Sequence, residues 1–348
     1  MDFNKYKELF VEEAREQNKD DLYINKCLSY AQQLNNKNIP IIYNQEHFSK
    51  LVGVKLEFLI KISNSQFSYY RFFKIPKSNG KKRLIAEPLP MLKIVQKYIL
   101  EKILIKIPCS KYSKAYIKNN SLKDNAKFHR KQRYILKIDL KDYFGNLKKD
   151  RVYDFFINLG YAKDVSILLC NLCTLDGSLP QGAPTSPYLS NLLTINLDND
   201  LFNYCRDNRE LRYSRYADDI TISGDFNPKQ VIRDVIGIIK KNKLFVNYDK
   251  IAVIGQNKRQ EVTGIVVNQK MQVSKAYRKK IRQEIYYIKK FGIEVHMKSQ
   301  NINYPEDLER YVRNLAGRIN YCLSVNNNDL EMFKYKQFVC KELFSNFE

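Results

Sequence analysis

The stretch LRYSRYADDITIS, which runs from Leu211 to Ser223, decides how the whole sequence is interpreted. Its tetrapeptide Tyr216-Ala217-Asp218-Asp219 lies between two runs of alternating apolar and polar residues, which predicts a β-hairpin with the tetrapeptide at its tip. Two adjacent carboxylates at such a tip repel each other and find no apolar surface. A cation between them relieves the repulsion, and a pair of divalent metal ions that grips a nucleoside triphosphate is the obvious candidate.

A third carboxylate, Asp139, lies on a predicted strand over Tyr134–Leu140. Alternate residues of this strand are apolar and share one face, so Asp139 points the opposite way. If this strand lies beside the hairpin, Asp139 and Asp218 come together, and two carboxylates can bridge two Mg²⁺ ions roughly 3.5–4 Å apart. Alone, Asp139 reads as an ordinary solvent-facing aspartate; its combination with the paired aspartates favours the metal site.

The loop LPQGAPTSP, from Leu179 to Pro187, is the second strong signal. Gly182 and the prolines fix an irregular backbone, and the small residues allow a flat substrate to approach closely. Gln181 can donate and accept hydrogen bonds at once. A Pro-rich turn before the helix that starts at Pro187 is the simpler alternative, but the run is long and specific.

A basic hairpin is predicted around Ser78-Asn79-Gly80, within a stretch from Tyr70 to Arg83 that holds six basic residues and no acid. Lys77 and Arg83 flank the turn, where they could clamp a triphosphate. A solvated basic hairpin remains the alternative for its other lysines.

Composition points to a polyanionic partner. Lys and Arg number 60 against 37 acidic residues, a net charge of +23, and the sequence pI is near 9.5. Nucleic acid is the first reading and an anionic membrane surface the second. The 348 residues suffice for two or three subdomains. The sequence lacks a membrane-span pattern and a signal-peptide pattern, and its seven scattered cysteines fit reduced thiols, so a cytoplasmic location and no membrane partner are expected.

Apolar periodicity predicts the remaining elements. Helices are expected over about 91–107, 150–175, 186–205 and 228–243, and strands near 244–254 and 260–267. Ser274 is predicted to cap a basic helix that ends near Gly292, and a last amphipathic helix carries Leu308 to Cys322.

These motifs, taken together, resemble the palm motifs of reverse transcriptases in the expected order. The resemblance rests on Asp139 with Phe144, on the Leu179–Pro187 loop and on the Tyr216–Asp219 box, and it covers roughly residues 67–270. Two shorter features resemble the retron branch of that family, namely Asn125-Ala126-x-x-His129 before the first strand and Val262-Thr263-Gly264 after the hairpin.

The resemblance implies an α+β, right-hand polymerase fold with fingers, a palm built on an antiparallel sheet, and a helical thumb. The expected divisions are an N-terminal helical extension with the fingers over 1–133, a palm over 134–270 and a basic helical thumb over 271–348. A helical segment of the palm, about 151–178, is expected to return toward the fingers. The implied activity is that of an RNA-directed DNA polymerase with two Mg²⁺ ions per active site, which Mn²⁺ could replace.

The resemblance also assigns roles to individual residues. The aspartates 139, 218 and 219 are expected to be catalytic and to ligate the metals, and Phe144 to be the steric gate that rejects a ribose 2′-OH. The expected dNTP-binding residues are Lys77, Arg83, Phe144, Gln181 and Gly182. The expected nucleic-acid-binding residues are Asn125, His129, Val262, Thr263, Gly264, Lys275, Arg278, Lys279 and Arg282.

Three of these readings stay open at the level of sequence. His129 fits either a core histidine or an RNA contact, and a tight turn alone explains the glycine of Thr263-Gly264. Lys250 lies where the family often has a lysine, without a defined role.

A retron enzyme, as the resemblance implies, uses a structured noncoding RNA as both template and primer. It starts from a guanosine 2′-OH, consumes dNTPs and leaves a branched RNA–DNA product. An effector or toxin protein in phage defence and a host RNase H that trims the template are its expected partners. The alternatives are a group II intron-like or other defence-associated reverse transcriptase and, in a different class, a catalytically inactive RNA-binding scaffold. The intact acids argue against a scaffold, which has no physical reason to keep a repulsive cluster.

Overall fold

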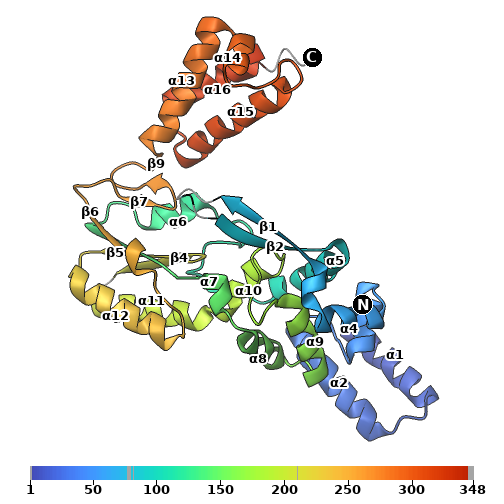
Figure 1. Cartoon of the computed structure of the whole chain (residues 1–348). Helices are drawn as coiled ribbons and strands as arrows, with labels where there is room; N and C mark the ends of the chain where they lie inside the picture. The colour runs from blue at the N-terminus through green and yellow to red at the C-terminus, as the bar shows by residue number, and fades with distance from the viewer. Residues whose placement is uncertain (1, 77–79, 81, 210, 344–348) are drawn as a thin grey trace. The chain divides into compact units, whose positions relative to one another are not determined.

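The computed structural model describes residues 2–76, 80, 82–209 and 211–343 (Figure 1). The chain divides into two compact units, each built from three stretches of sequence. The first unit holds residues 1–117, 139–203 and 233–248, and the second unit holds residues 118–138, 204–232 and 249–348.

The first unit is mainly helical. Its N-terminal helices are α1 (Phe3–Glu16), α2 (Asp21–Asn36), α3 (Gln45–Val52), α4 (Leu56–Asn64) and α5 (Pro90–Tyr98), followed by a π-helical turn (Ile99–Ile103) and a 3-10 turn (Leu104–Lys106). Its other helices are α7 (Tyr143–Asn146), α8 (Lys149–Leu159), α9 (Lys163–Cys173) and α10 (Ser186–Leu193), with most of α11 (Ile195–Arg209) and α12 (Pro228–Lys241). The helix α9 packs against α3, α4 and α5 because seven of its eleven residues are buried.

The basic hairpin forms as predicted. The strands β1 (Tyr70–Pro76) and β2 (Lys82–Pro88) pair antiparallel, with Tyr70 opposite Pro88 and Ile75 opposite Arg83. Every residue of β1 after Tyr70 is exposed, so most of this strand presents side chains to solvent.

The second unit contains a four-stranded sheet in the order β4-β5-β3-β6. Its strands are β3 (Tyr134–Asp139), β4 (Arg212–Tyr216), β5 (Asp219–Gly224) and β6 (Ala252–Gly255), and α6 (Leu122–Phe128) packs against β4. The pairs β4–β5 and β3–β6 are antiparallel. The prediction of a strand near 244–254 is wrong for the residues before β6. A 3-10 turn (Tyr248–Lys250) interrupts the extended chain there.

The C-terminal part of the second unit is a small sheet and a helical bundle (Figure 1). The sheet is β7 (Glu261–Val262), β8 (Ile265–Val266) and β9 (Gln272–Val273), and the helices are α13 (Lys275–Phe291), α14 (Ile293–Ser299), α15 (Leu308–Val325) and α16 (Leu330–Phe338), with a π-helical turn after α16 (Val339–Leu343). Ser274 caps α13 as predicted, because its hydroxyl accepts from the Tyr277 N–H. Ile281 and Ile285 of α13 pack with Val312 and Ile319 of α15 in one core. The sequence analysis predicted no helix over the residues of α16.

Among the residues that the structure describes, none of the helices is long and apolar enough to span a membrane.

Candidate active site

The acidic hairpin is a two-residue turn whose conformation is unusual. Tyr216 pairs with Asp219, so Ala217 and Asp218 form the turn itself. Ala217 adopts φ +57, in the left-handed region that favours glycine. The guanidinium of Arg215, a fully buried side chain, donates to the Ala217 carbonyl at 3.0 Å and holds this turn. Both aspartates are only half-buried, so their carboxylates can be reached from solvent.

Asp139 is the last residue of β3, and β3 is the neighbour of β5, whose first residue is Asp219. The Asp139 side chain is 9% exposed. Asn247 fixes this residue twice: its backbone N–H donates to the Asp139 carbonyl at 2.8 Å, and its side-chain amide donates to the Asp139 carboxylate at 3.2 Å. Asn247 is a positioning residue that sequence reasoning did not single out, because nothing in the pattern marks this contact across 108 residues.

His129 and Asn125 are buried residues that contact the hairpin, as the core-histidine alternative implies for His129, and their expected contact with nucleic acid stays a prediction. Both side chains are buried, at 0% and 1% exposure. The His129 ring bridges the two strands, with Nδ1 2.7 Å from the Ser223 hydroxyl of β5 and Nε2 2.7 Å from the Ser214 hydroxyl of β4. Ser214 in turn donates to Asn125 Oδ1 at 2.6 Å, so the Nε2 position must donate to Ser214. The network ties α6 to both strands of the hairpin.

We expect His129→Ala to lower the free energy of unfolding by about 1–3 kcal/mol, because the buried Ser223 and Ser214 hydroxyls each lose a hydrogen bond to the ring and Ser214 keeps only Asn125. Chemical denaturation of the purified protein measures this loss. His47→Ala, which removes a half-buried histidine of α3, is the matched control and should cost less. A loss for His129→Ala no greater than the control's would contradict the bridging role.

Phe144 lies in the short helix α7, which the neighbouring Tyr143 anchors to α10. The preceding Tyr143 is buried, and its hydroxyl donates to the Ser190 carbonyl of α10 at 3.1 Å. The Phe144 ring packs edge-on against Tyr143 with 5.5 Å between centroids and stays half-buried. A Cβ at Gly145 would meet the Asp142 carboxylate at 2.2 Å, so a larger residue there would force the Asp142 side chain to move. A bulky, anchored and accessible ring results.

The Leu179–Pro187 loop packs against β2. The Gln181 carbonyl accepts the Ala86 N–H at 2.8 Å, and the Gln181 side chain remains half-buried. Gly182 has φ +128, and a Cβ there would lie 2.6 Å from the Ala86 carbonyl oxygen. Both the backbone conformation and the close approach therefore require glycine at this position.

We expect Gly182→Ala to destabilise this junction by about 1–3 kcal/mol from backbone strain alone, with the steric clash added. Gly177→Ala is a matched control, since Gly177 also has a positive φ but a Cβ there meets nothing within 4 Å. Thermal or chemical denaturation should show a larger loss for Gly182→Ala. Equal losses would mean that the contact with Ala86 adds nothing to the strain.

The expected phosphate-binding residues lie on and beside the basic hairpin. Arg83 is an exposed residue of β2, opposite Ile75. Lys77 lies outside the residues that the structure describes. Lys250 ends the 3-10 turn before β6 and is exposed.

The Val262-Thr263-Gly264 motif forms a tight turn between β7 and β8. Val262 pairs with Ile265, and both turn residues have positive φ, +47 for Thr263 and +82 for Gly264, as in a type I′ hairpin. Val262 is fully buried, and its expected contact with nucleic acid stays a prediction. Thr263 is half-buried and Gly264 exposed, so only these two are accessible.

The four basic residues predicted on α13 fall into two pairs. Arg278 and Arg282 are ion-paired to the start of α16: Arg278 contacts Asp329 at 3.0 Å and Glu331 at 2.7 Å, and Arg282 contacts Glu331 at 2.6 Å. These hydrogen bonds from Arg282 lower the pKa of Glu331. The Arg278 side chain is only 18% exposed, and its expected contact with nucleic acid stays a prediction.

Lys275 and Lys279 are exposed and remain predicted contacts. Together with Arg278 and Arg282 they line a hollow of ≈ 710 Å³ along α13, whose wall also carries Tyr286 and Tyr287. Basic and aromatic side chains in one groove suit a nucleic-acid backbone and its exposed bases.

The carboxylates of Asp218 and Asp219 suit Mg²⁺, which needs few protein ligands. Among the described residues, no three His, Cys, Asp or Glu side chains form a ready-made metal cage. Mg²⁺ seldom uses such a cage; it binds one or two carboxylates and completes its shell with water and substrate phosphates. The hard carboxylate oxygens of Asp218 and Asp219, accessible at a turn, are donors of the right kind.

Comparison with known proteins agrees with these features. Residues 75–267 match the family described as reverse transcriptase (RNA-dependent DNA polymerase). The chain therefore belongs to the reverse transcriptases, and the predicted α+β, right-hand polymerase fold and polymerase activity are confirmed.

Curated relatives place the chain in the retron type. It is 34% identical to the retron Ec86 reverse transcriptase of Escherichia coli, over 74% of this chain and 81% of the relative. It is 29% identical to the retron Mx65 reverse transcriptase of Myxococcus xanthus, over 86% of this chain and 72% of that one. The chain is thus a retron-type reverse transcriptase rather than a group II intron-like enzyme or an inactive scaffold.

Solved structures with a similar fold include a telomerase from Candida albicans, with a TM-score of 0.48, 12% identity and coverage of 82% of this chain and 64% of that one. The foamy viral protease-reverse transcriptase has a TM-score of 0.40 and 18% identity, over 72% of this chain and 35% of that chain.

Proposed function

We propose that this reverse transcriptase copies a structured noncoding RNA that is both its template and its primer. Synthesis would begin at a guanosine 2′-OH and leave a branched RNA–DNA product. The observation that supports this proposal most directly is the similarity to retron enzymes over most of both chains, together with the intact acidic hairpin.

The chemistry is proposed to be two-metal phosphoryl transfer. Asp139, Asp218 and Asp219 would hold two Mg²⁺ ions, which when bound lower the pKa of the attacking hydroxyl and neutralise charge on the leaving pyrophosphate. The protein itself positions the donors. Asn247 holds the Asp139 carboxylate, and Arg215 with the β4–β5 pairing holds the backbone of the turn that carries Asp218, which supports a role for these residues in positioning the metal ligands.

Selection of the nucleotide is proposed to rest on the first unit. Phe144, anchored through Tyr143, would meet the 2′ position of the incoming sugar and exclude a hydroxyl. Gln181 and Gly182 would line the dNTP pocket, where the close packing on Ala86 keeps the surface flat. Arg83 and Lys77 would hold the phosphates.

The wider biology is also a proposal. A retron product commonly accompanies an effector or toxin protein in phage defence, and a host RNase H would trim the copied template. The net charge of +23 suits a protein that stays bound to its nucleic-acid product.

The nucleic acid that copurifies with the protein tests this proposal. The gene should be expressed together with its flanking DNA, the protein purified, and the bound nucleic acid treated with RNase and with an enzyme that cleaves 2′–5′ branches. We expect a DNA strand whose mobility changes after debranching. Linear DNA without a 2′–5′ linkage, made by an active enzyme, would refute priming from a 2′-OH.

A further inference from the structure

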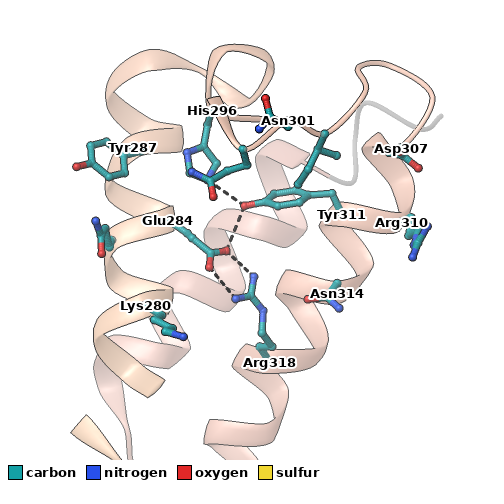
Figure 2. A pocket seen from close by; sticks show the side chains of 13 residues that line it. Lys280, Glu284, Tyr287, His296, Asn301, Asp307, Arg310, Tyr311, Asn314 and Arg318 are labelled. Atoms are coloured by element: carbon teal, nitrogen blue, oxygen red, sulfur yellow. Dashed lines mark hydrogen bonds and ion pairs between the residues drawn. The ribbon is translucent and has the colours of Figure 1, made fainter. Parts of the chain in front are cut away.

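A second hollow lies inside the C-terminal helical bundle, on the other side of the Gln283–Tyr287 segment of α13. It has a volume of ≈ 680 Å³ and lies between α13, α14 and α15 (Figure 2). The size is typical of a site for a small molecule or a single nucleotide. Gln283 and Tyr287 line this pocket and also the basic hollow along α13, so the two hollows adjoin.

The interior of the pocket is held by a chain of polar contacts. Arg318 of α15 binds the Glu284 carboxylate with both terminal nitrogens, the Tyr311 hydroxyl donates to Glu284 at 3.1 Å, and His296 Nε2 lies 3.1 Å from the same hydroxyl (Figure 2). Burial raises the pKa of Tyr311, with Glu284 adding to the effect, so the phenol keeps its proton. Arg318 therefore balances the Glu284 charge within the wall, and Asp307 is a second carboxylate that lines the pocket.

The aromatic side chains of the pocket offer flat surfaces. Tyr287 and His296 stack with 18° between their planes and 6.0 Å between centroids. Burial lowers the pKa of His296, against the opposing effect of Glu284, so the ring is neutral at neutral pH. A neutral aromatic wall favours a neutral, planar partner over an anion.

Amide side chains and rim cations complete the pocket. Gln300 and Asn301 from the end of α14, and Asn314 from α15, offer donors and acceptors together. Lys280 and Arg310 are exposed at the pocket. Amides with stacking surfaces recognise the hydrogen-bonding edge of an unpaired base, and nearby cations suit its phosphate.

We propose that this pocket binds one unpaired, extruded base of a folded RNA whose backbone follows the basic hollow on α13. The inference rests on the proposed function, since it specifies how the enzyme would recognise its own RNA. It assigns base recognition to the pocket and phosphate binding to the adjoining hollow. A single site of this kind would distinguish an RNA with a suitable loop from a duplex of the same charge.

Equilibrium binding of labelled hairpin RNAs tests the proposal. Four RNAs share one stem and carry a short loop of adenosine, cytidine, guanosine or uridine, and the blunt duplex of that stem is the reference. The wild-type protein should prefer at least one looped RNA to the duplex. Asn314→Leu should weaken that looped complex by about tenfold and leave duplex binding unchanged, because only the base edge loses a partner.

The chain offers two matched controls on the same helix. Asn320→Leu, at an exposed asparagine of α15 outside the pocket, is the control for Asn314→Leu. Arg313→Gln, at an exposed arginine of α15 outside the pocket, is the control for Arg310→Gln. The controls should bind both RNAs like the wild type, whereas Arg310→Gln should weaken the looped complex. Equal affinity of the wild type for looped and blunt RNA, or equal effects of Asn314→Leu and Asn320→Leu, would overturn the proposal.

Extension of a DNA primer annealed to an RNA template, measured on the same preparations, separates the two levels of inference. If extension proceeds and the loop preference is absent, only the pocket proposal fails. If the loop preference is present and the wild type does not extend the primer, the proposed copying function fails instead.

Discussion

Replacing Asp218 with asparagine is expected to reduce primer extension on an RNA template by about a thousandfold or more. The substitution keeps the size of the side chain but removes the charge that would hold a metal ion, and such a contact is worth several kcal/mol in the transition state. RNA binding should remain nearly unchanged, because Asp218 lies in a two-residue turn and contributes no positive charge. Single-turnover extension with dNTPs and Mg²⁺ measures the loss.

Asp225→Asn is the matched control for this experiment. Asp225 follows the same hairpin, is exposed and is ion-paired to Arg133 at 2.7 Å. This variant should extend primers at close to the wild-type rate. An Asp218→Asn enzyme that polymerised at the wild-type rate would remove Asp218 from the metal site.

Replacing Phe144 with alanine is expected to raise the use of rNTPs relative to dNTPs by about tenfold to a hundredfold. The ring is the only bulk that α7 presents beside the buried Tyr143, so its loss opens space for one hydroxyl. The ratio of kcat/KM for a matched rNTP and dNTP measures the change. Phe155→Ala, a half-buried phenylalanine of α8, should leave the ratio unaltered. Unchanged sugar selectivity in Phe144→Ala would remove the gate role.

The parts of this molecule that follow from local pattern could be predicted from the sequence. The alternation of apolar and polar residues on both sides of Ala217-Asp218 predicted the hairpin correctly. The helical spacing of apolar residues after Ser274, together with this serine as a cap, predicted α13 correctly. The extended chain before β6 was misjudged because Phe245 and Val246 are strand-prone, whereas the following Tyr248–Lys250 segment turns in a 3-10 conformation. Intrinsic preference is a weak guide when tertiary contacts, such as those of Asn247 with Asp139, set the backbone.

Interactions between distant residues could not be predicted in this way. Nothing in the sequence near His129 reveals that its two ring nitrogens reach Ser214 and Ser223, 85 and 94 residues away. The same holds for Arg278, whose charge reads as available for phosphate until Asp329 is placed beside it. A motif can therefore be recognised correctly while its side chains serve packing instead of ligand contact.

The pairing of α16 with α13 bears on how tightly this enzyme holds any polyanion. Two carboxylates at the start of α16 offset part of the charge of Arg278 and Arg282, which line the same hollow as Lys275 and Lys279. An uncompensated row of four cations would bind every RNA in the cell more strongly and move along it more slowly. By this pairing α16 lowers the net positive charge of the α13 surface, which should weaken the salt-dependent attraction to any RNA.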